Sequence, residues 1–560
     1  MSADPTPTVV LGFDALDSRH LERFEDDLPN FARLREAGAE APLRSSFPPW
    51  TGSAWPSMYT GVGPDHHGVY DFLAYGDRYP DDAAVVSRND VRAPALWNYL
   101  TAVDVPSVVL NVPVTHPAEP INGVVIPGYL APEDAAGSPA GVRDDLSAAI
   151  GEPYRIYSST EMADDAERKL EGYLELIRMR AAAAGELLSA HEWGLAFVQV
   201  QKTDAVFHNF DDEAAFRAVY AAADDVVGTV LDAVDDANVV VCSDHGIGPT
   251  DGYKLYLNEV LRRHGFVEAT RAPTRATLAS RKAALVEGHE GGGSADGDGD
   301  ADGGNGRRTP LAARATSSAL SIADAVGVSP GDVYALAERL GVSETLRAML
   351  PESVTASVDR GVDWRRSRAY CRSGSELGVR VNLEGREPEG VVPPDEYEQV
   401  RSELVDLLSS LRTPDGAPAF EFVRRREAVY DGPMAGDACD VVFAPADMNN
   451  TVATNLMGRA FVPVDTYDHD WQGVFVATGP SFASTADPGA LSLLDVAPIV
   501  MAAMGLDVPG RMDGSVPADL LSGPSARAPY PDVDYGTGDR AAAESDDGEV
   551  TARLEDLGYL

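Results

Sequence analysis

The sequence predicts an α/β fold with a mostly parallel central sheet, and two observations support this. Through the first half of the chain, short apolar runs rich in β-branched residues alternate with helical patterns. This alternation is typical of a parallel sheet that is covered by helices on both faces. The alternation returns from Val362 onward, after a middle region of different composition. A chain of 560 residues is long enough for one such domain with insertions, or for two or three domains.

The same patterns place the individual elements. Buried strands are predicted at 7–13, 107–112, 195–200, 237–242, 377–383, 439–443 and 473–478. Helices are predicted at 28–37, 95–102, 170–188, 214–235, 395–411 and 493–504. A further helix is predicted to open at Ala54, shortly after Thr51. The stretch 111–129 is too rich in proline for a helix, so we expect loops beside the sheet there.

The middle of the chain predicts an insertion. Residues 289–306 are almost all Gly, Asp, Ala and Ser, and such a segment cannot bury enough apolar surface to offset its chain entropy. We therefore expect a disordered loop there, with helical patterns on either side at 278–286 and 317–349. The predicted division is 1–270 and 361–524 for the two parts of the main α/β domain, 271–360 for the helical insertion, and 525–560 for an acidic tail.

The charge of the chain argues against nucleic-acid binding through a basic patch. Acidic residues number 89 against 45 basic residues, so the formal net charge is −44. Because nucleic-acid backbones bind Lys and Arg, this balance is unfavourable for them. Four of the basic residues are lysines, namely Lys169, Lys202, Lys254 and Lys282. High acidity with few lysines is typical of a halophilic protein, because concentrated salt screens its self-repulsion.

The remaining composition predicts a cytoplasmic protein. The N-terminus lacks a basic region followed by an apolar core, so no signal peptide is expected. No stretch approaches about 18 uninterrupted apolar residues, so no membrane span is expected. Cys242, Cys371 and Cys439 are far apart and show neither a disulfide pattern nor a zinc-ribbon spacing, so we expect buried thiols.

Chemically active residues follow three of the predicted strands. Asp14, Asp204 and the pair Asp244 and His245 each come just after an apolar run. Because the carboxyl ends of parallel strands converge on one crevice, we expect these residues to lie together. Each of them alone has an ordinary explanation, since Asp after a strand often caps a helix and a lone His is usually a core or surface residue.

Three further residues extend this set. Asp204 and His208 are four positions apart, a spacing that places two side chains on one helix face. His469 lies just before the strand predicted at 473–478 and is able to close the same site. Thr51 lies near the start of a helix, where unpaired N–H groups and the helix dipole favour an anion, although a helix cap is the alternative. Carboxylate and imidazole ligands without thiolate suit Zn²⁺, Mn²⁺ or Fe²⁺ better than Ca²⁺.

Taken together, these motifs resemble the alkaline phosphatase superfamily, and within it the type I phosphodiesterase/nucleotide pyrophosphatase-like family. The resemblance rests on VVLGFDALD, SFPPWTGSAWPSMYTG, TDAVFHN, SDHG and HDWQGVF, in this order along the chain. It extends to NVPVTHPAEPINGV, to VDWRRSRAYC with VNLEGREPEGVV, and to the closing LEDLGYL. It implies an alkaline phosphatase-like three-layer sandwich around the mostly parallel sheet.

The resemblance also implies roles for seven residues. Thr51 would be the nucleophile and a metal ligand. The ligands of the first cation would be Asp14, Thr51, Asp244 and His245, and those of the second would be Asp204, His208 and His469. Two divalent cations are thus expected, with Zn²⁺ as the first choice and Mn²⁺ or Fe²⁺ as alternatives.

The predicted function is metal-dependent hydrolysis of a phosphodiester or pyrophosphate bond through a covalent phosphothreonine intermediate. The expected substrate is a phosphorylated small molecule or a phosphodiester linked to a lipid or glycan. A phosphomonoesterase, a phosphonate hydrolase or a phosphotransferase would use the same ligands. A non-catalytic metal-binding protein would lack a ligand or the nucleophile, and all seven residues are present. A sulfatase needs a Cys/Ser-x-Pro-x-Arg motif, which residues 51–55 do not offer.

Overall fold

The computed structural model describes residues 5–76, 79, 83–161, 163, 165–270, 361–483, 486–530 and 533–536. The predicted insertion 271–360, with its helices and its loop, lies outside the described residues. Most of the predicted acidic tail and the closing LEDLGYL also lie outside them.

An eight-stranded sheet forms the centre of the molecule, in the order β21-β2-β20-β8-β1-β7-β5-β6. Its strands are β1 (Thr8–Phe13), β2 (Ala39–Arg44), β5 (Ser107–Leu110), β6 (Gly123–Ile126), β7 (Leu195–Val200), β8 (Asn238–Cys242), β20 (Gln472–Thr478) and β21 (Leu491–Ser492). The two antiparallel pairs in this sheet are those that β20 makes with β2 and β8. The other neighbouring pairs are parallel, which confirms the predicted sheet.

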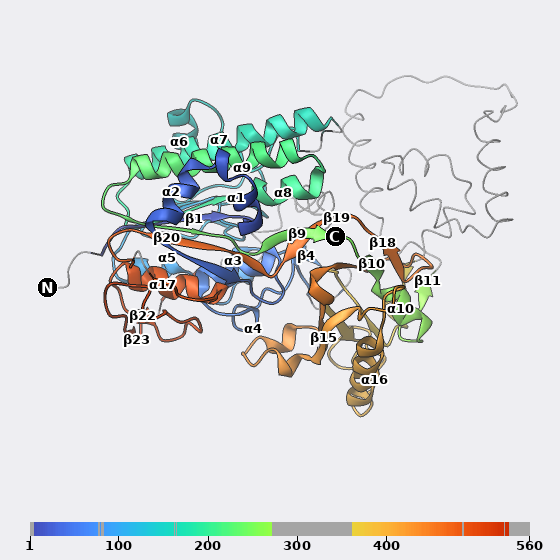
Figure 1. Ribbon diagram of the computed structural model, residues 1–560. Helices are drawn as coiled ribbons and strands as arrows, with labels where there is room; N and C mark the ends of the chain where they lie inside the picture. The colour runs from blue at the N-terminus through green and yellow to red at the C-terminus, as the bar shows by residue number, and fades with distance from the viewer. Residues whose placement is uncertain are drawn as a thin grey trace, which may run out of the picture.

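Helices cover both faces of this sheet, and Figure 1 shows the three layers. One face carries α1 (Ser18–Arg23), α2 (Pro29–Ala37), α6 (Val142–Ile150), α7 (Ala166–Ala190), α8 (Lys202–Asn209) and α9 (Glu213–Ala233). The other face carries α3 (Thr51–Thr60), α4 (Pro64–His67), α5 (Leu96–Ala102) and α17 (Val496–Ala503). Because the sheet is covered on both sides, β1, β7 and β8 are buried along their whole length. Among the described residues, no helix is both long enough and apolar enough to cross a membrane.

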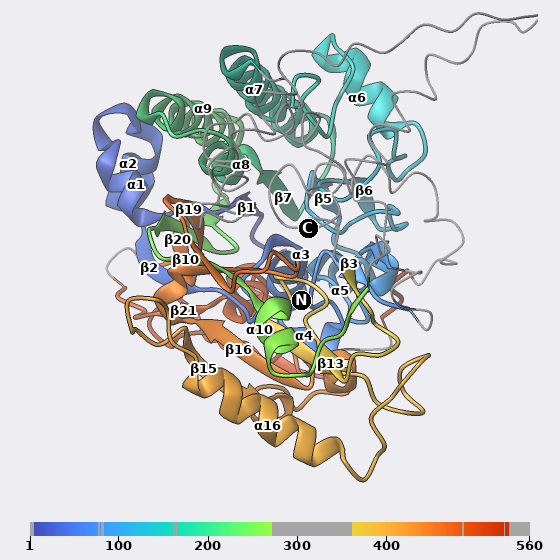
Figure 2. The ribbon, with the colours of Figure 1, turned by 90° about the vertical axis from the view of Figure 1, so that its right-hand side faces the viewer.

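A smaller antiparallel sheet lies at the far side of the molecule from α7 and α9 (Figure 2). Its order is β13-β14-β16-β15, and its strands are β13 (Ala369–Tyr370), β14 (Gly378–Val381), β15 (Phe420–Arg425) and β16 (Val441–Pro445). The helix α16 (Tyr397–Ser410) covers it, and this helix buries Val400, Leu404 and Leu408. Next to it lie α10 (Leu257–Arg263) and a sheet of β10 (Tyr253–Tyr256), β17 (Asn450–Ala453) and β18 (Phe461–Pro463).

The remaining strands form short pairs. They are β3 (Leu73–Ala74) with β4 (Ala84–Val85), β9 (Gly246–Thr250) with β19 (Thr466–Asp470), β11 (Ala269–Thr270) with β12 (Gly361–Val362), and β22 (Val508–Pro509) with β23 (Arg527–Ala528). The antiparallel pair β11–β12 brings the two ends of the segment 271–360 together. The chain therefore leaves and returns to the described structure at one place, which supports the proposal that this segment is an insertion.

Two local predictions were wrong. The stretch 111–129 contains a four-residue strand, β6, because the apolar run from Gly123 pairs with β5 even though prolines surround it. The helix α3 begins at Thr51 itself, three residues earlier than predicted. His469 lies just before the strand β20, as predicted, and it also belongs to the short strand β19, which pairs with β9.

Candidate active site

The carboxyl ends of three adjacent strands bring the predicted site residues together. Strand β1 lies between β7 and β8 and is parallel to both. Asp14 follows β1, Asp244 and His245 follow β8, and Asp204 lies in the first turn of α8, just after β7. The three segments therefore reach the same edge of the sheet, as the sequence predicted.

Thr51 lies at this edge because α3 packs closely under β1. A Cβ atom at Gly12 of β1 would lie 2.5 Å from the Trp55 ring, so a glycine there allows α3 to approach. The hydroxyl of Thr51, a residue that is 1% exposed, donates a hydrogen bond to Asp14 Oδ1 at 3.2 Å and lies 3.4 Å from His245 Nε2. Thr51 is also the first residue of the helix, and the first N–H groups of a helix have no intrahelical acceptor.

Two overlapping groups of possible ligand atoms lie at this edge of the sheet, and the Thr51 hydroxyl contacts two members of the first group. The first group consists of Asp14, Asp244 and His245, whose ligand atoms all lie within 4.8 Å of one another. His245 Nε2 lies 3.2 Å from Asp244 Oδ2 and 3.5 Å from Asp14 Oδ1. The Nδ1–H group of His245 donates to the Gly246 carbonyl oxygen at 3.0 Å, and this contact turns Nε2 towards the carboxylates.

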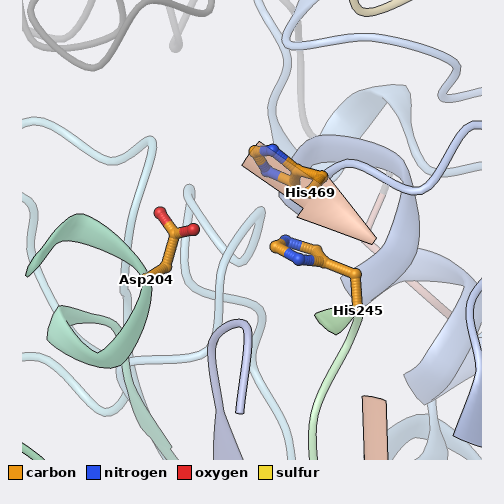
Figure 3. Close-up of side chains that lie close together, drawn as sticks. All are labelled: Asp204, His245 and His469. Atoms are coloured by element: carbon orange, nitrogen blue, oxygen red, sulfur yellow. The ribbon is translucent and has the colours of Figure 1, made fainter. Parts of the chain in front are cut away.

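The second group consists of Asp204, His245 and His469, again within 4.8 Å. Figure 3 shows these three side chains pointing into one space from three separate segments. His208 joins this group, because its Nε2 lies 3.1 Å from Asp204 Oδ1 and its ring centre lies 5.3 Å from that of His469. The structure therefore brings all seven predicted residues together, with His245 shared between the two groups.

The electrostatics of the site show crowded negative charge. Burial raises the pKa of Asp14 and of Asp244, and the neighbouring carboxylate raises the pKa of Asp244 further. Burial alone would lower the pKa of His245, but the charges of Asp244 and Asp14 raise it to about 10. Burial alone would raise the pKa of Asp204, as it does for the other two carboxyl groups. The neighbouring His208 and His469 instead hold the pKa of Asp204 well below its usual range. Burial and the charge of His245 lower the pKa of His469.

The site residues fit divalent cations. Asp244 is fully buried, and its Oδ2 has no hydrogen-bond partner among the described residues, although His245 Nε2 lies nearby. Buried carboxylates need a compensating charge, and a cation between Asp244 and Asp14 would supply it. The side-chain donors are carboxylate, imidazole and hydroxyl groups, a set that suits Zn²⁺, Mn²⁺ or Fe²⁺.

The sequence did not reveal three residues that support the site. Asp468 accepts the Nδ1–H of His469 at 2.8 Å, so Nε2 is the ligand atom that His469 is able to offer. Gln199 donates to Asp14 Oδ2 at 3.0 Å, and Asn111 donates to Gln199 Oε1 at 2.8 Å. Gln199 is the polar residue in the otherwise apolar strand 195–200. Because a buried amide needs hydrogen-bond partners, its presence there could have indicated a contact with a polar residue of the site.

Comparisons with known proteins agree with this geometry. The sequence profile described as type I phosphodiesterase / nucleotide pyrophosphatase matches residues 8–298, which is just over half of the 560 residues. No curated protein sequence matches the chain.

Solved structures of similar fold include phosphonoacetate hydrolase from Sinorhizobium meliloti 1021 in complex with phosphonoformate. Its TM-score is 0.53 at 15% identity, over 90% of this chain and 97% of that one. Human ectonucleotide pyrophosphatase / phosphodiesterase 5 has a TM-score of 0.50 at 12% identity, over 92% of this chain and 100% of that one. At these identities the likeness shows the fold alone, which is alkaline phosphatase-like, as predicted.

The family is typically dependent on divalent metal ions, in agreement with the two groups of carboxylate and imidazole ligands. The chain belongs to the type I phosphodiesterase / nucleotide pyrophosphatase family and is a hydrolase of phosphoester bonds.

Proposed function

We propose that the chain cleaves phosphodiester or pyrophosphate bonds by nucleophilic attack of Thr51, and that a covalent phosphothreonine forms and is then hydrolysed. The observation that supports this most directly is the position of the Thr51 hydroxyl. It lies against Asp14 and His245, members of the first ligand group, and His245 also belongs to the second. An ordinary helix cap would not need six ionisable side chains gathered near it, of which five are buried.

The seven residues would hold two divalent cations. One cation would be held by Asp14, Thr51, Asp244 and His245, and the other by Asp204, His208 and His469. When bound, the two cations supply positive charge that lowers the pKa of the Thr51 hydroxyl and stabilises the attacking and leaving oxygens of an in-line displacement. Zn²⁺ is the proposed metal, with Mn²⁺ and Fe²⁺ as alternatives.

Residues of the chain position the attacking hydroxyl and the phosphoryl group. The Thr51 hydroxyl donates to Asp14 Oδ1, and its oxygen also faces His245 Nε2. In the first turn of α3, the N–H groups of Ser53 and Ala54 donate to the Trp50 carbonyl oxygen. The N–H groups of Thr51 and Gly52 would therefore be the ones to donate to a non-bridging phosphoryl oxygen. Attack by Thr51 Oγ1 forms the Oγ1–P bond and expels the alcohol or phosphate leaving group. Water then breaks the Oγ1–P bond and restores the threonine.

The nucleophile assignment is tested by replacing Thr51. We expect Thr51→Ala to abolish turnover of a chromogenic phosphodiester, because no other hydroxyl takes its place, while the cation content falls by at most one ion. Thr51→Ser keeps a hydroxyl and should retain measurable turnover. Acid quenching with a ³²P-labelled diester should trap label on the wild-type chain and not on Thr51→Ala. Undiminished turnover by Thr51→Ala would discard the assignment.

The substrate class is tested with a panel of compounds. We propose a phosphorylated small molecule or a phosphodiester linked to a lipid or glycan, with turnover of diesters and pyrophosphates above that of other esters. Chromogenic diesters, monoesters, phosphonates and sulfate esters should be compared with Zn²⁺ or Mn²⁺ at high salt. Preferred turnover of a phosphonate or monoester would replace the diester proposal with that activity, and transfer to an added alcohol would indicate a phosphotransferase.

We also propose a domain division, an adaptation to high salt and a cellular location. The division at 270, 360 and 524, with an insertion between two parts of one catalytic domain, is supported by the pairing of β11 with β12. Adaptation to high salt is supported by the net charge of −44. A cytoplasmic location is the third, and localisation of the full chain by fractionation tests it.

A further inference from the structure

Gln199 is an unusual residue for its position. It lies in β7, a strand buried along its whole length between β1 and β5, and its side chain is fully buried. The other residues of this strand are apolar. A buried amide is costly unless both its donor and its acceptor find partners, so the contacts of Gln199 need an explanation.

The amide nitrogen of Gln199 engages one oxygen of Asp14. Gln199 Nε2 donates to Asp14 Oδ2 at 3.0 Å, and the indole N–H of Trp55 donates to the same oxygen at 3.3 Å. The other oxygen, Oδ1, faces the Thr51 hydroxyl and the His245 ring. The two oxygens of Asp14 are therefore distinguished, because Oδ2 is occupied by neutral donors and Oδ1 faces the reaction centre.

Asn111 fixes the orientation of the Gln199 amide. Its Nδ2 donates to Gln199 Oε1 at 2.8 Å and to the Gln199 carbonyl oxygen at 3.2 Å. An ionised carboxylate only accepts hydrogen bonds, so Gln199 must present its nitrogen to Asp14 and its oxygen to Asn111. The direction of both amides therefore follows from the charge of Asp14.

The backbone of Asn111 is strained in a way that suits this role. Its φ angle is +62°, in the left-handed region that is unfavourable for a residue with a side chain, although Asn is among the better tolerated residues. Gly128 packs directly against this backbone, since a Cβ at Gly128 would lie 1.9 Å from the Asn111 carbonyl oxygen. A glycine at 111 would adopt the same conformation without strain, which provides a sharp test.

We propose that Asn111 and Gln199 form an amide relay that positions Asp14, so that only Oδ1 is presented to a cation and to the Thr51 hydroxyl. Both are positioning residues, because they act through Asp14 and touch neither the substrate nor the cation. The inference rests on the proposed function, in which Asp14 is a cation ligand.

The relay is tested by Zn²⁺ binding to the full chain after metal removal, measured by isothermal titration calorimetry. Gln199→Met keeps the size and loses the amide, and Asn111→Gly removes the donor while relieving strain. Loss of an outer partner of a metal ligand typically costs roughly 10- to 100-fold in affinity, so each variant should weaken one of the two Zn²⁺ sites by that factor. In both variants the kcat for a chromogenic diester should fall while KM stays unchanged.

Asn238 provides a matched control. It is also a fully buried amide in the central sheet, but it bonds to Thr8 and Ser481 at the opposite end of the strands. Asn238→Ala should lower the melting temperature and leave both Zn²⁺ affinities unchanged, which separates positioning from general stability.

The outcomes distinguish the relay from the function on which it rests. A wild-type chain that binds no Zn²⁺ overturns the cation sites and the relay with them. A wild-type chain that binds two ions, with unchanged affinity and kcat in Asn111→Gly, overturns the relay alone. If Gln199→Met does not fold, the Zn²⁺ affinity and kcat of Asn111→Gly alone test the relay, because a glycine at 111 is able to keep the same backbone conformation.

Discussion

At the scale of single residues, the site depends on which atom each side chain presents. His245 and His469 both use Nδ1 in a hydrogen bond, to the Gly246 carbonyl oxygen and to Asp468 respectively. Each ring therefore offers Nε2 to the centre. The same logic governs Asp14, whose Oδ2 is occupied by N–H donors. The hydrogen-bond partners of His245, His469 and Asp14 thus determine which atom each of these side chains presents.

Asp468 provides a prediction at this scale. Asp468→Ala removes the acceptor that orients His469, so we expect the affinity for the second cation to fall roughly 10- to 100-fold. Asp468→Asn keeps an acceptor oxygen and should lose less. The measurement is the Zn²⁺ content after dialysis, and Asp470→Ala on the same strand, which breaks an ion pair with Arg19, is the control. Two tightly held ions in Asp468→Ala would contradict this role.

The residues that the sequence revealed and those that it hid differ in one physical respect. Asp14 and the pair Asp244 and His245 were predictable, because each follows an apolar run whose end is fixed by the sheet. Gln199 acts through the side chain of Asp14, which is distant in sequence, and local patterns carry no information on such a contact. Asp468 acts through its neighbour His469, but the sequence does not show which ring nitrogen the carboxylate contacts. The roles of all seven predicted residues stay predictions until the variants are measured.

At the scale of elements, the long apolar strands and the amphipathic helices were predictable, whereas short or polar strands were not. The strand β2 contains Pro42 and alternates buried with more exposed residues, yet it pairs with β20 inside the main sheet. The strand β19 has the sequence TYDHD, which has little intrinsic strand preference, and it is held extended by β9. Pairing with strands that are distant in sequence, rather than local preference, therefore explains why these two segments are strands.

The contact between α3 and α4 should make the free energy of unfolding depend on pH. His67 of α4 is fully buried, accepts the Val69 N–H and contacts the Ser57 hydroxyl of α3 at 2.9 Å. Burial lowers the pKa of His67 from 6.5 to about 3. Between these values the unfolded chain binds a proton that the folded chain excludes, so acid destabilises the fold. The contribution of His67 should fall by up to about 1.4 kcal/mol per pH unit as the pH drops below 6.5.

The variant His67→Gln tests this contribution. Glutamine keeps a donor and an acceptor but does not titrate, so the decline of unfolding free energy with acid should be shallower than in wild type. Urea unfolding at pH 7, 6 and 5 gives the two slopes. Parallel slopes in wild type and His67→Gln would show that His67 does not limit the acid stability of the helix that carries Thr51.

At the scale of the whole molecule, the surface charge and the site charge oppose each other. The net charge of −44 repels an anionic phosphoester over long distances, while two divalent cations would reverse the sign of the potential locally. A mostly parallel sheet covered on both faces was predictable from the alternation of apolar runs with helical patterns, and the family resemblance implied the three-layer sandwich. The arrangement of the smaller sheet was not predictable, because its strands are short and antiparallel with distant partners.

The same charge predicts how stability depends on salt. Self-repulsion among 89 acidic residues weakens as the Debye length falls from about 10 Å at 0.1 M to about 3 Å at 1 M, so KCl should raise the melting temperature, with most of the rise below about 1 M. Scanning calorimetry from 0.1 to 3 M KCl measures this. Sucrose at matched osmolality is the control, because it leaves charge repulsion unscreened and separates screening from exclusion at the surface. A melting temperature that stays level or falls with KCl would mean that ion pairs such as Arg217 with Asp27 outweigh the repulsion.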